Sequence, residues 1–231
     1  MISDVLAAIE QASDPGELFD LMTDYFAAQG FGGVCYVAPR GVTGHYTLLE
    51  RGMPAEWMEY YREHSLHLHD PIPGMAFRLG RAERLDILMK SLTSLTSDEQ
   101  AFLEAFKSSG ITNGLAIPAF GPMGRPGFIG LTQLAHPALL DEIDIPLAAA
   151  VAQQVHSRME RLQSGSEWPQ LSPREREILA LMAQGKSNTD IATILAIAPP
   201  TVATHVRRIF AKLSVHDRVN CVAKALALHL I

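Results

Sequence analysis

Residues 171–213 constrain the fold most strongly, because capping and helix-breaking residues divide them into short helices. Ser172 is a candidate N-cap, with Pro173 at the first helical position and Glu175 three residues after the cap, which is a capping-box pattern. Gly185 ends this helix as a left-handed C-cap would. A segment that starts and stops helices at such short intervals predicts a small all-helical unit.

Two more helices follow in the same segment. Ser187 or Asn188 can cap the second helix, and Pro199 fits only before or at the start of the third. The third helix is expected from Thr201 to Leu213. Its apolar residues recur at helical spacing and predict a buried stripe of Val202, Val206, Ile209 and Leu213. Its other face carries Ala203, Thr204, Arg207 and Arg208, with His205 beside them.

Two short helices, a tight turn and a third helix with a small and basic outer face are the arrangement of a helix-turn-helix unit, whose second helix enters the DNA major groove. Arg reads guanine through two hydrogen bonds, and Thr can donate, accept or contact the thymine methyl. The predicted DNA contacts are Lys186, Ser187, Asn188, Thr201, Ala203, Thr204, His205, Arg207 and Arg208, of which Lys186, Ser187, Asn188 and Arg208 would hold phosphates. A three-helix bundle whose charges are merely solvated is the alternative.

The same residues closely resemble the LuxR-type DNA-binding domain. The resemblance runs through LSPRERE, GKSNTDIA, TVATHVRRI and KLSVHDR and covers about sixty residues. It implies that Glu177 is a structural carboxylate of this domain. Ala203 stands where many relatives carry a long polar or basic side chain, so the resemblance assigns more of the base reading to Thr204 and Arg207.

Length and composition leave room for a second domain. A chain of 231 residues with 48% apolar residues can build two ordinary cores. There is no apolar run long enough for a membrane span, and the acidic N-terminus does not read as a signal peptide. Cys35 and Cys221 lie in different halves, which argues against a disulfide framework and suits the reducing cytoplasm.

Charge is divided unevenly along the chain. Residues 166–231 carry eight Lys and Arg against five Asp and Glu, a net charge of +3, whereas residues 1–165 have a net charge of −9. A basic small domain behind an acidic larger one predicts that only the former binds nucleic acid. The excess is modest, so we expect specific DNA binding to need a homodimer.

The first 162 residues alternate between helical and strand patterns. Helices are expected at 4–12, 15–29, from Pro54, from Pro71, from Ser97 or Asp98 to Ser109, and at 139–163, and strands at 32–39, 44–51, 112–120 and 127–135, with 82–92 irregular or briefly helical. This order predicts an α+β fold, an α–β–α sandwich around a mostly antiparallel sheet, followed by an all-α four-helix domain. The predicted domains are 1–162 and 171–231, joined by a linker at 163–170.

Three polar side chains in the first domain suit a small ligand with a carbonyl and an amide. Trp57 and Tyr61 share one face of a helix, and Asp70 follows nine residues later. An indole N–H, a phenol and a carboxylate supply the matching donors and acceptor. The alternative is structural: Trp and Tyr at this spacing are usually core residues, and Asp70 before Pro71 is a good N-cap.

This constellation ahead of this DNA-binding pattern resembles the acyl-homoserine-lactone receptors of the LuxR family, which carry W-x3-Y, then D-P, then a Gly before the last hairpin. The resemblance implies that Trp57 donates to the lactone carbonyl, Tyr61 donates to the acyl carbonyl and Asp70 accepts the amide N–H, with Gly114 architectural. Leu85 replaces an aromatic residue expected at the pocket floor, and Met53 precedes Pro54 where an aromatic is common. Thr132 would add a hydroxyl if it faces the pocket.

Other chemistries find less support. His64, His67, His69 and Asp70 could bind zinc, but their spacing follows no recognised zinc pattern. No phosphate loop or nucleophile elbow appears, so no enzyme and no cofactor are predicted. A phosphorylated response regulator would begin with a strand and acidic residues, whereas this chain begins with helices.

The sequence therefore predicts a transcriptional regulator that responds to a small molecule, an N-acyl-homoserine lactone or a related compound. Helix 139–162 and the last helix, 217–230, would supply dimer surfaces, with Val219, Val222 and Leu226 on one side of the latter or packed inside the domain. DNA and RNA polymerase are the expected macromolecular partners. No association with a membrane is expected. An orphan regulator that binds DNA without a lactone is the main alternative.

Overall fold

The computed structural model describes residues 2–40, 45–121, 125–163, 169–228 and 230–231. They form two compact units, which divide after Gln163. The predicted turn at residues 39–44 and the predicted linker fall largely outside the described residues. None of the helices in the described ranges has the length and apolar character needed to cross a membrane.

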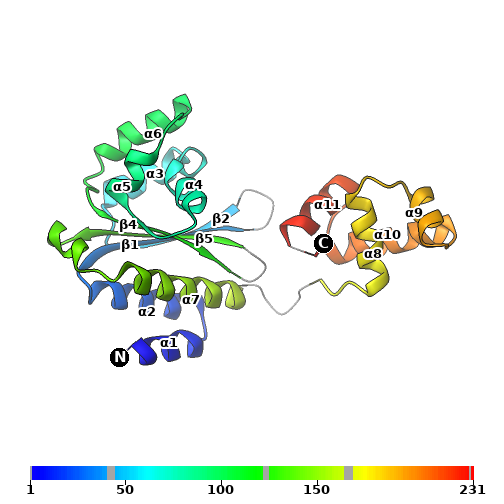
Figure 1. Ribbon diagram of the computed structural model, residues 1–231, viewed down its shortest axis with the longest axis horizontal. Helices are drawn as coiled ribbons and strands as arrows, with labels where there is room; N and C mark the ends of the chain where they lie inside the picture. The colour runs from blue at the N-terminus through cyan, green and yellow to red at the C-terminus, as the bar shows by residue number, and fades with distance from the viewer. Residues whose placement is uncertain (1, 41–44, 122–124, 164–168, 229) are drawn as a thin grey trace. The chain divides into compact units, whose positions relative to one another are not determined.

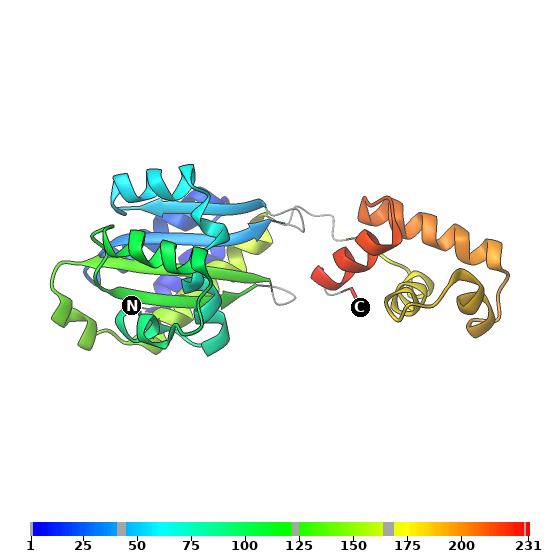
Figure 2. The ribbon, with the colours of Figure 1, turned by 90° about the horizontal axis from the view of Figure 1, so that it is seen from above.

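A five-stranded sheet forms the middle of the first unit, in the order β2-β1-β5-β4-β3. Strand β5 pairs antiparallel with both β1 and β4, and β3 pairs antiparallel with β4. Figure 2 shows blue β1 beside green β5. The strands are β1 (Phe31–Arg40), β2 (His45–Arg51), β3 (Glu83–Arg84), β4 (Gly114–Phe120) and β5 (Pro126–Leu134).

Helices cover both faces of this sheet (Figure 1). On one face lie α2 (Pro15–Ala27) and α7 (Ile145–Gln163), and α1 (Ile2–Gln11) packs on the outer side of these two helices (Figure 1). The opposite layer contains α3 (Ala55–Glu63), α4 (Pro71–Leu79), α5 (Leu85–Ser91) and α6 (Ser97–Lys107). Short 3-10 helices, η1 (Leu66–Leu68) and η3 (Pro137–Asp141), complete the chain connections. The predicted α–β–α sandwich is confirmed.

The central strands are buried on both faces, so each face has its own core. In β4, Leu115 and Ile117 pack in the core beneath α2 and α7, whereas Ala116 packs on the other side. Alternation along a strand sends successive side chains to opposite faces. Because both faces are covered by helices, β4 reads as a nearly continuous apolar run in the sequence.

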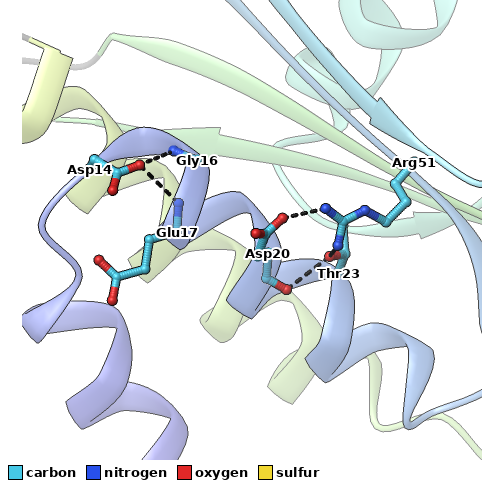
Figure 3. Close-up of polar contacts among 6 residues, drawn as sticks. All are labelled: Asp14, Gly16, Glu17, Asp20, Thr23 and Arg51. Atoms are coloured by element: carbon cyan, nitrogen blue, oxygen red, sulfur yellow. Dashed lines mark hydrogen bonds and ion pairs between the residues drawn. The ribbon is translucent and has the colours of Figure 1, made fainter.

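Polar contacts fix α2 at its start and on the side that meets strand β2 (Figure 3). Asp14 is the N-cap, and its Oδ1 accepts hydrogen bonds from the amides of Gly16 and Glu17 at 2.8 and 3.0 Å. Arg51, the last residue of β2, donates to Thr23 at 2.7 Å and pairs with Asp20. The guanidinium therefore ties the edge strand to this helix.

The long helix α7 begins later than the sequence predicted. It starts at Ile145, because Asp144 accepts a hydrogen bond from the Leu147 amide at 3.0 Å and caps the helix. Leu147 of this helix is 37% exposed. The buried stripe of α7 includes Ala148, Val151, Val155 and Met159.

The region 82–92 contains more order than the sequence predicted. Residues Glu83 and Arg84 form strand β3 against β4, and α5 follows at once. Two residues are too few for a strand pattern to be recognised. Helix α6 is capped by Thr96 through a capping box with Glu99, one residue before the predicted start.

Gly114 is architectural, as predicted. Its φ of +148° lies outside the range that side-chain-bearing residues usually adopt, and an added Cβ would lie 2.0 Å from the Leu131 carbonyl oxygen. Only glycine allows β4 to approach β5 this closely.

The second unit is all-helical and contains four helices in its described part. They are α8 (Pro173–Ala183), α9 (Asn188–Ile194), α10 (Pro199–Leu213) and α11 (Arg218–Ala227). The predicted stripe of Val202, Val206, Ile209 and Leu213 is buried in their common core. Ser172 and Ser187 both form capping boxes, with Glu175 and Asp190 respectively.

The buried carboxylate in the described part of this unit is Glu175, whereas Glu177, to which the resemblance assigns a structural role, lies at the surface. Glu175 is 3% exposed and accepts a hydrogen bond from Lys212 of α10 at 2.7 Å. The Glu177 side chain is 55% exposed and pairs with Arg174 on the surface. Two residues along a helix correspond to about 200° of rotation, so the two carboxylates point in nearly opposite directions.

Candidate functional site

A cavity of about 60 Å³ lies in the first unit, between the sheet and the layer formed by α3–α6. All five residues predicted from the sequence to bind a ligand line it: Trp57, Tyr61, Asp70, Leu85 and Thr132. Most of the remaining lining is apolar. The cavity is smaller than the roughly 300–1,000 Å³ typical of ligand pockets, so an acylated ligand would have to move side chains in its wall.

Local structure explains how distant residues reach the cavity. Trp57 and Tyr61 lie one turn apart on the buried face of α3, Asp70 caps α4, and Leu85 is the first residue of α5. Thr132 extends from β5 and lines the cavity, so it faces the α3–α6 side of the sheet. Helix α3 thus places two side chains around this space, and the α4 cap, α5 and β5 place one each.

Asp70 and Tyr61 form the polar centre of the cavity. The Tyr61 hydroxyl donates to Oδ2 of Asp70 at 3.1 Å, and Oδ1 accepts from the Ile72 amide at 2.9 Å. Burial of the carboxyl group raises the pKa of Asp70 to about 7, although both hydrogen bonds oppose that shift. Burial also raises the pKa of Tyr61, so its phenol remains a donor at neutral pH.

Trp57 belongs to an aromatic cluster at one wall of the cavity. Its ring lies edge-on to Phe102 and Phe106 of α6, with centroid distances of 5.8 and 5.5 Å. The two Phe rings stack on each other at 5.9 Å. Trp57 is therefore a core residue, as the structural alternative expected, and its ring also lines the cavity.

Two further lining residues were not singled out as ligand contacts. The Thr132 hydroxyl donates to the sulfur of Met53 at 3.2 Å, and both residues line the cavity. Cys35 of β1 contributes a thiol whose pKa burial raises to about 12, so it behaves as a neutral group. Alternation along β1 and β5 could have placed Cys35 on this face, but only with the strand register known.

The histidines that precede Asp70 do not converge. His64 contacts the Tyr60 carbonyl at 3.1 Å, His67 lies against the Tyr46 ring, and His69 lies 3.6 Å from Asp98. In the described parts of the chain, no three potential metal ligands come together.

The predicted DNA contacts in the second unit fall into two surface groups. Thr201, Arg207 and Arg208 are exposed on α10, whereas Ala203, Thr204 and His205 are half-buried there. Thr204 donates to the Pro200 carbonyl at 3.0 Å, and Arg207 reaches the same hydroxyl at 3.4 Å. Lys186 and Ser187 are exposed in the turn before α9, and Asn188 is half-buried at the first position of that helix.

Helix α11 leaves apolar side chains outside the core of its unit. Val219 is 78% exposed and Leu226 is 53% exposed, whereas Val222 is half-buried. The intradomain alternative is therefore wrong for Val219 and Leu226. The first residue of this helix, Arg218, contacts the turn before α9, a connection that the sequence did not predict.

Both units match known protein families. Residues 14–159 match the family described as "Autoinducer binding domain", and residues 169–225 match "Bacterial regulatory proteins, luxR family". The transcriptional activator protein SolR of Ralstonia nicotianae is 27% identical, and the alignment covers 99% of this chain and 98% of SolR. The transcriptional activator protein PhzR of Pseudomonas fluorescens is 26% identical, over 91% of this chain and 84% of PhzR.

Solved structures share the fold. The crystal structure of Escherichia coli SdiA aligns with a TM-score of 0.75 at 20% identity, over 99% of this chain and 97% of SdiA. SdiA in complex with octanoyl-rac-glycerol aligns with a TM-score of 0.69 at 19% identity, over 98% of this chain and 93% of that one. Since the two family matches together span most of the sequence, the protein belongs to the LuxR family of bacterial transcriptional regulators, with an autoinducer-binding domain and a helix-turn-helix domain.

Proposed function

We propose that the protein senses an N-acyl-homoserine lactone, or a related small amide or lactone, and that occupancy of its pocket controls binding of a dimer to a palindromic operator. The observation that carries this proposal is the meeting of Trp57, Tyr61, Asp70, Leu85 and Thr132 around one largely apolar cavity. A few polar groups in an apolar pocket favour a ligand with a small polar head and an acyl chain.

The polar groups match the parts of such a ligand. Trp57 would donate to the lactone carbonyl and Tyr61 to the acyl carbonyl, while ionised Asp70 would accept the amide N–H. The Thr132 hydroxyl, which now donates to Met53, would be a further donor once that side chain moves. Leu85 would contact the ligand through its apolar side chain. No other cofactor is needed for this function.

For DNA binding, α10 would enter the major groove, with Thr204 and Arg207 at base edges. Thr201, Ala203 and His205 would lie beside them, and Lys186, Ser187, Asn188 and Arg208 would hold phosphates. The exposed guanidinium groups of α10 and the exposed turn before α9 support this assignment. We assign residues 1–162 to sensing, 163–170 to the linker and 171–231 to DNA binding.

A homodimer would present two copies of α10, roughly 34 Å apart, to a near-palindrome. The exposed Val219 and Leu226 lie about two turns apart on one side of α11 and support a dimer contact on this helix, because a second copy would bury both side chains. Helix α7 would supply a second contact through the exposed Leu147. RNA polymerase would be a further partner if the protein activates transcription, and the compartment would be the cytoplasm.

Thermal unfolding of the full chain tests the sensing half. A ligand at a hundredfold excess over its Kd adds about 2.7 kcal/mol, which would raise the Tm by roughly 5–10 °C. We expect at least one N-acyl-homoserine lactone in a series of acyl lengths, or octanoyl-glycerol, to produce that shift in the wild type. An Asp70→Ala variant should not respond. Unchanged melting with the whole series would contradict the sensing proposal.

A second function is favoured by the small size of the cavity. Leu85 and Met53 occupy positions where the pocket would otherwise gain flat aromatic surface, and about 60 Å³ of space remains. These features support an orphan regulator that binds DNA constitutively or responds to another ligand. Mass spectrometry of small molecules that co-purify with the protein separates the two functions, because a lactone sensor would carry lactone from a producing host.

A further inference from the structure

The turn between α8 and α9 is held at both ends by its own helices. Gly185 adopts a left-handed conformation with φ of +79°, and the Lys186 amide donates back to the Leu181 carbonyl at 3.1 Å. Ser187 exchanges hydrogen bonds with Asp190 in a capping box. These contacts fix where the turn begins and ends, but they leave the carbonyl of Lys186 to be held from elsewhere.

A third attachment comes from α11, about thirty residues further along the chain. One arm of the Arg218 guanidinium donates to the Lys186 carbonyl oxygen, and the other reaches Oδ1 of Asn188 at 3.4 Å. A planar guanidinium can bridge two acceptors in fixed geometry, whereas an ammonium group acts as a single point. Arg218 is half-buried, and Lys186 is exposed.

We infer that Arg218 is a positioning residue for DNA binding, which aims the Lys186 side chain at a phosphate by holding the backbone of the turn. This inference rests on the proposed function, because Lys186 is a phosphate contact only if the second unit binds DNA. Arg218 itself does not touch the DNA. Arg218 is the first residue of α11, the helix that carries the exposed Val219 and Leu226. A partner bound to that helix would therefore also restrain the contacts of Arg218 with the turn.

Salt-dependent binding of the full chain to a labelled DNA duplex of mixed sequence tests this inference. Phosphate contacts dominate binding to such DNA, and each one contributes about 0.9 to the slope of log K against log salt. We expect Lys186→Ala to lower the slope by about 0.9. Arg218→Gln should lower it by the same amount, because it releases the turn, and the double variant should lose no more than either single one.

Two further variants separate positioning from charge and from unfolding. Lys224→Gln removes one positive charge from the same helix and should keep the wild-type slope. Arg218→Lys keeps the charge but can hold only one acceptor, so it should bind DNA less tightly than the wild type and more tightly than Arg218→Gln. If circular dichroism shows that Arg218→Gln does not fold, Arg218→Lys replaces it. The salt slopes of Arg218→Lys, Lys186→Ala and their double variant are then compared in the same way.

Additive losses in the double variant, with a slope reduced by about 1.8, would mean that Arg218 contacts a phosphate directly and would overturn the inference. Wild-type affinity in folded Arg218→Gln or Arg218→Lys would overturn it as well. In both cases the DNA-binding function stands, because the wild type still binds with a salt-dependent slope. A wild-type chain that binds no duplex at any salt concentration, with or without a lactone that raises its Tm, overturns the proposed function and this inference with it.

Discussion

The hydroxyl of Tyr61 donates to the carboxyl group of Asp70 across 3.1 Å, inside a cavity whose other walls are largely apolar. The second oxygen of that carboxyl group caps α4 through the Ile72 amide. Asp70 therefore serves the fold and the candidate site at once. The structural and functional interpretations of this residue, which are alternatives at the level of sequence, are both compatible with one geometry.

The buried Asp70 carboxyl should leave a signature in the pH dependence of stability. Its pKa is raised to about 7 in the folded protein, against about 3.9 in an unfolded chain. The folded state thus holds a proton that the unfolded state loses between about pH 4 and 7, so the group's stabilising contribution falls as the pH rises through that window. Asn caps helices as well as Asp does. We expect the Tm of Asp70→Asn minus the Tm of the wild type to increase from pH 4 to pH 8. Curves of Tm against pH that stay parallel for the two proteins would contradict this.

The same carboxyl group should make ligand affinity depend on pH. A protonated Asp70 cannot accept an amide N–H as a carboxylate does, so binding of such a ligand must displace the proton. We expect the affinity for an N-acyl-homoserine lactone to rise with pH up to about 7, by at most about tenfold per unit, and then to level off. Calorimetry between pH 5 and 8 measures this. Asp70→Asn should bind more weakly and without that slope, and an equal slope in both proteins would exclude Asp70 as its origin.

Glu175 and Glu177 should differ sharply in their effect on the helix-turn-helix unit. Glu175 is buried, completes the capping box of α8 and pairs with Lys212, and these contacts lower its pKa against the effect of burial. Glu175→Ala should destabilise the unit by about 1–3 kcal/mol, because it removes one half of the capping box and the carboxylate that pairs with Lys212. Glu177→Ala, its surface control, should cost less than about 0.5 kcal/mol. Urea unfolding followed by circular dichroism compares them, and equal costs would refute the assignment.

A polar network on the other side of the sheet leaves no room for a side chain at Gly127. Tyr36 donates to Nδ1 of His156 at 2.8 Å, and Nε2 donates to the Arg125 carbonyl at 2.9 Å. A Cβ on Gly127 would lie 2.2 Å from that Nδ1. Gly127→Ala should therefore destabilise the first unit by about 1–3 kcal/mol.

The matched control for this substitution is Gly74, inside α4, where an added Cβ would meet nothing within 4 Å. Gly74→Ala should stabilise the protein by about 0.5–1 kcal/mol, because alanine favours the helix. If the His156 network is rigid, thermal melting should show a lower Tm than the wild type for Gly127→Ala and a higher Tm for Gly74→Ala. A neutral Gly127→Ala would show that His156 moves aside.

Patterns within one element could be predicted from the sequence, and contacts between distant elements could not. The caps at Ser172 and Asp70 and the stripe on α10 follow from spacing along a single helix. The hydrogen bond between Tyr36 and His156 joins residues that are 120 positions apart, and no local sequence pattern indicates it. Strand β3 was missed because two residues carry no periodicity.

The central claim is that a ligand in the pocket near Asp70 controls the affinity of α10 for DNA. Its most direct test is the affinity of the full chain for operator DNA, selected in vitro from random sequence, measured by fluorescence anisotropy with and without a lactone that raises the Tm. We predict that the lactone strengthens DNA binding by the wild type, that Asp70→Ala loses this response, and that the double variant Thr204→Ala, Arg207→Ala binds weakly in either condition. Equal DNA affinity of the wild type with and without the bound lactone would contradict the claim.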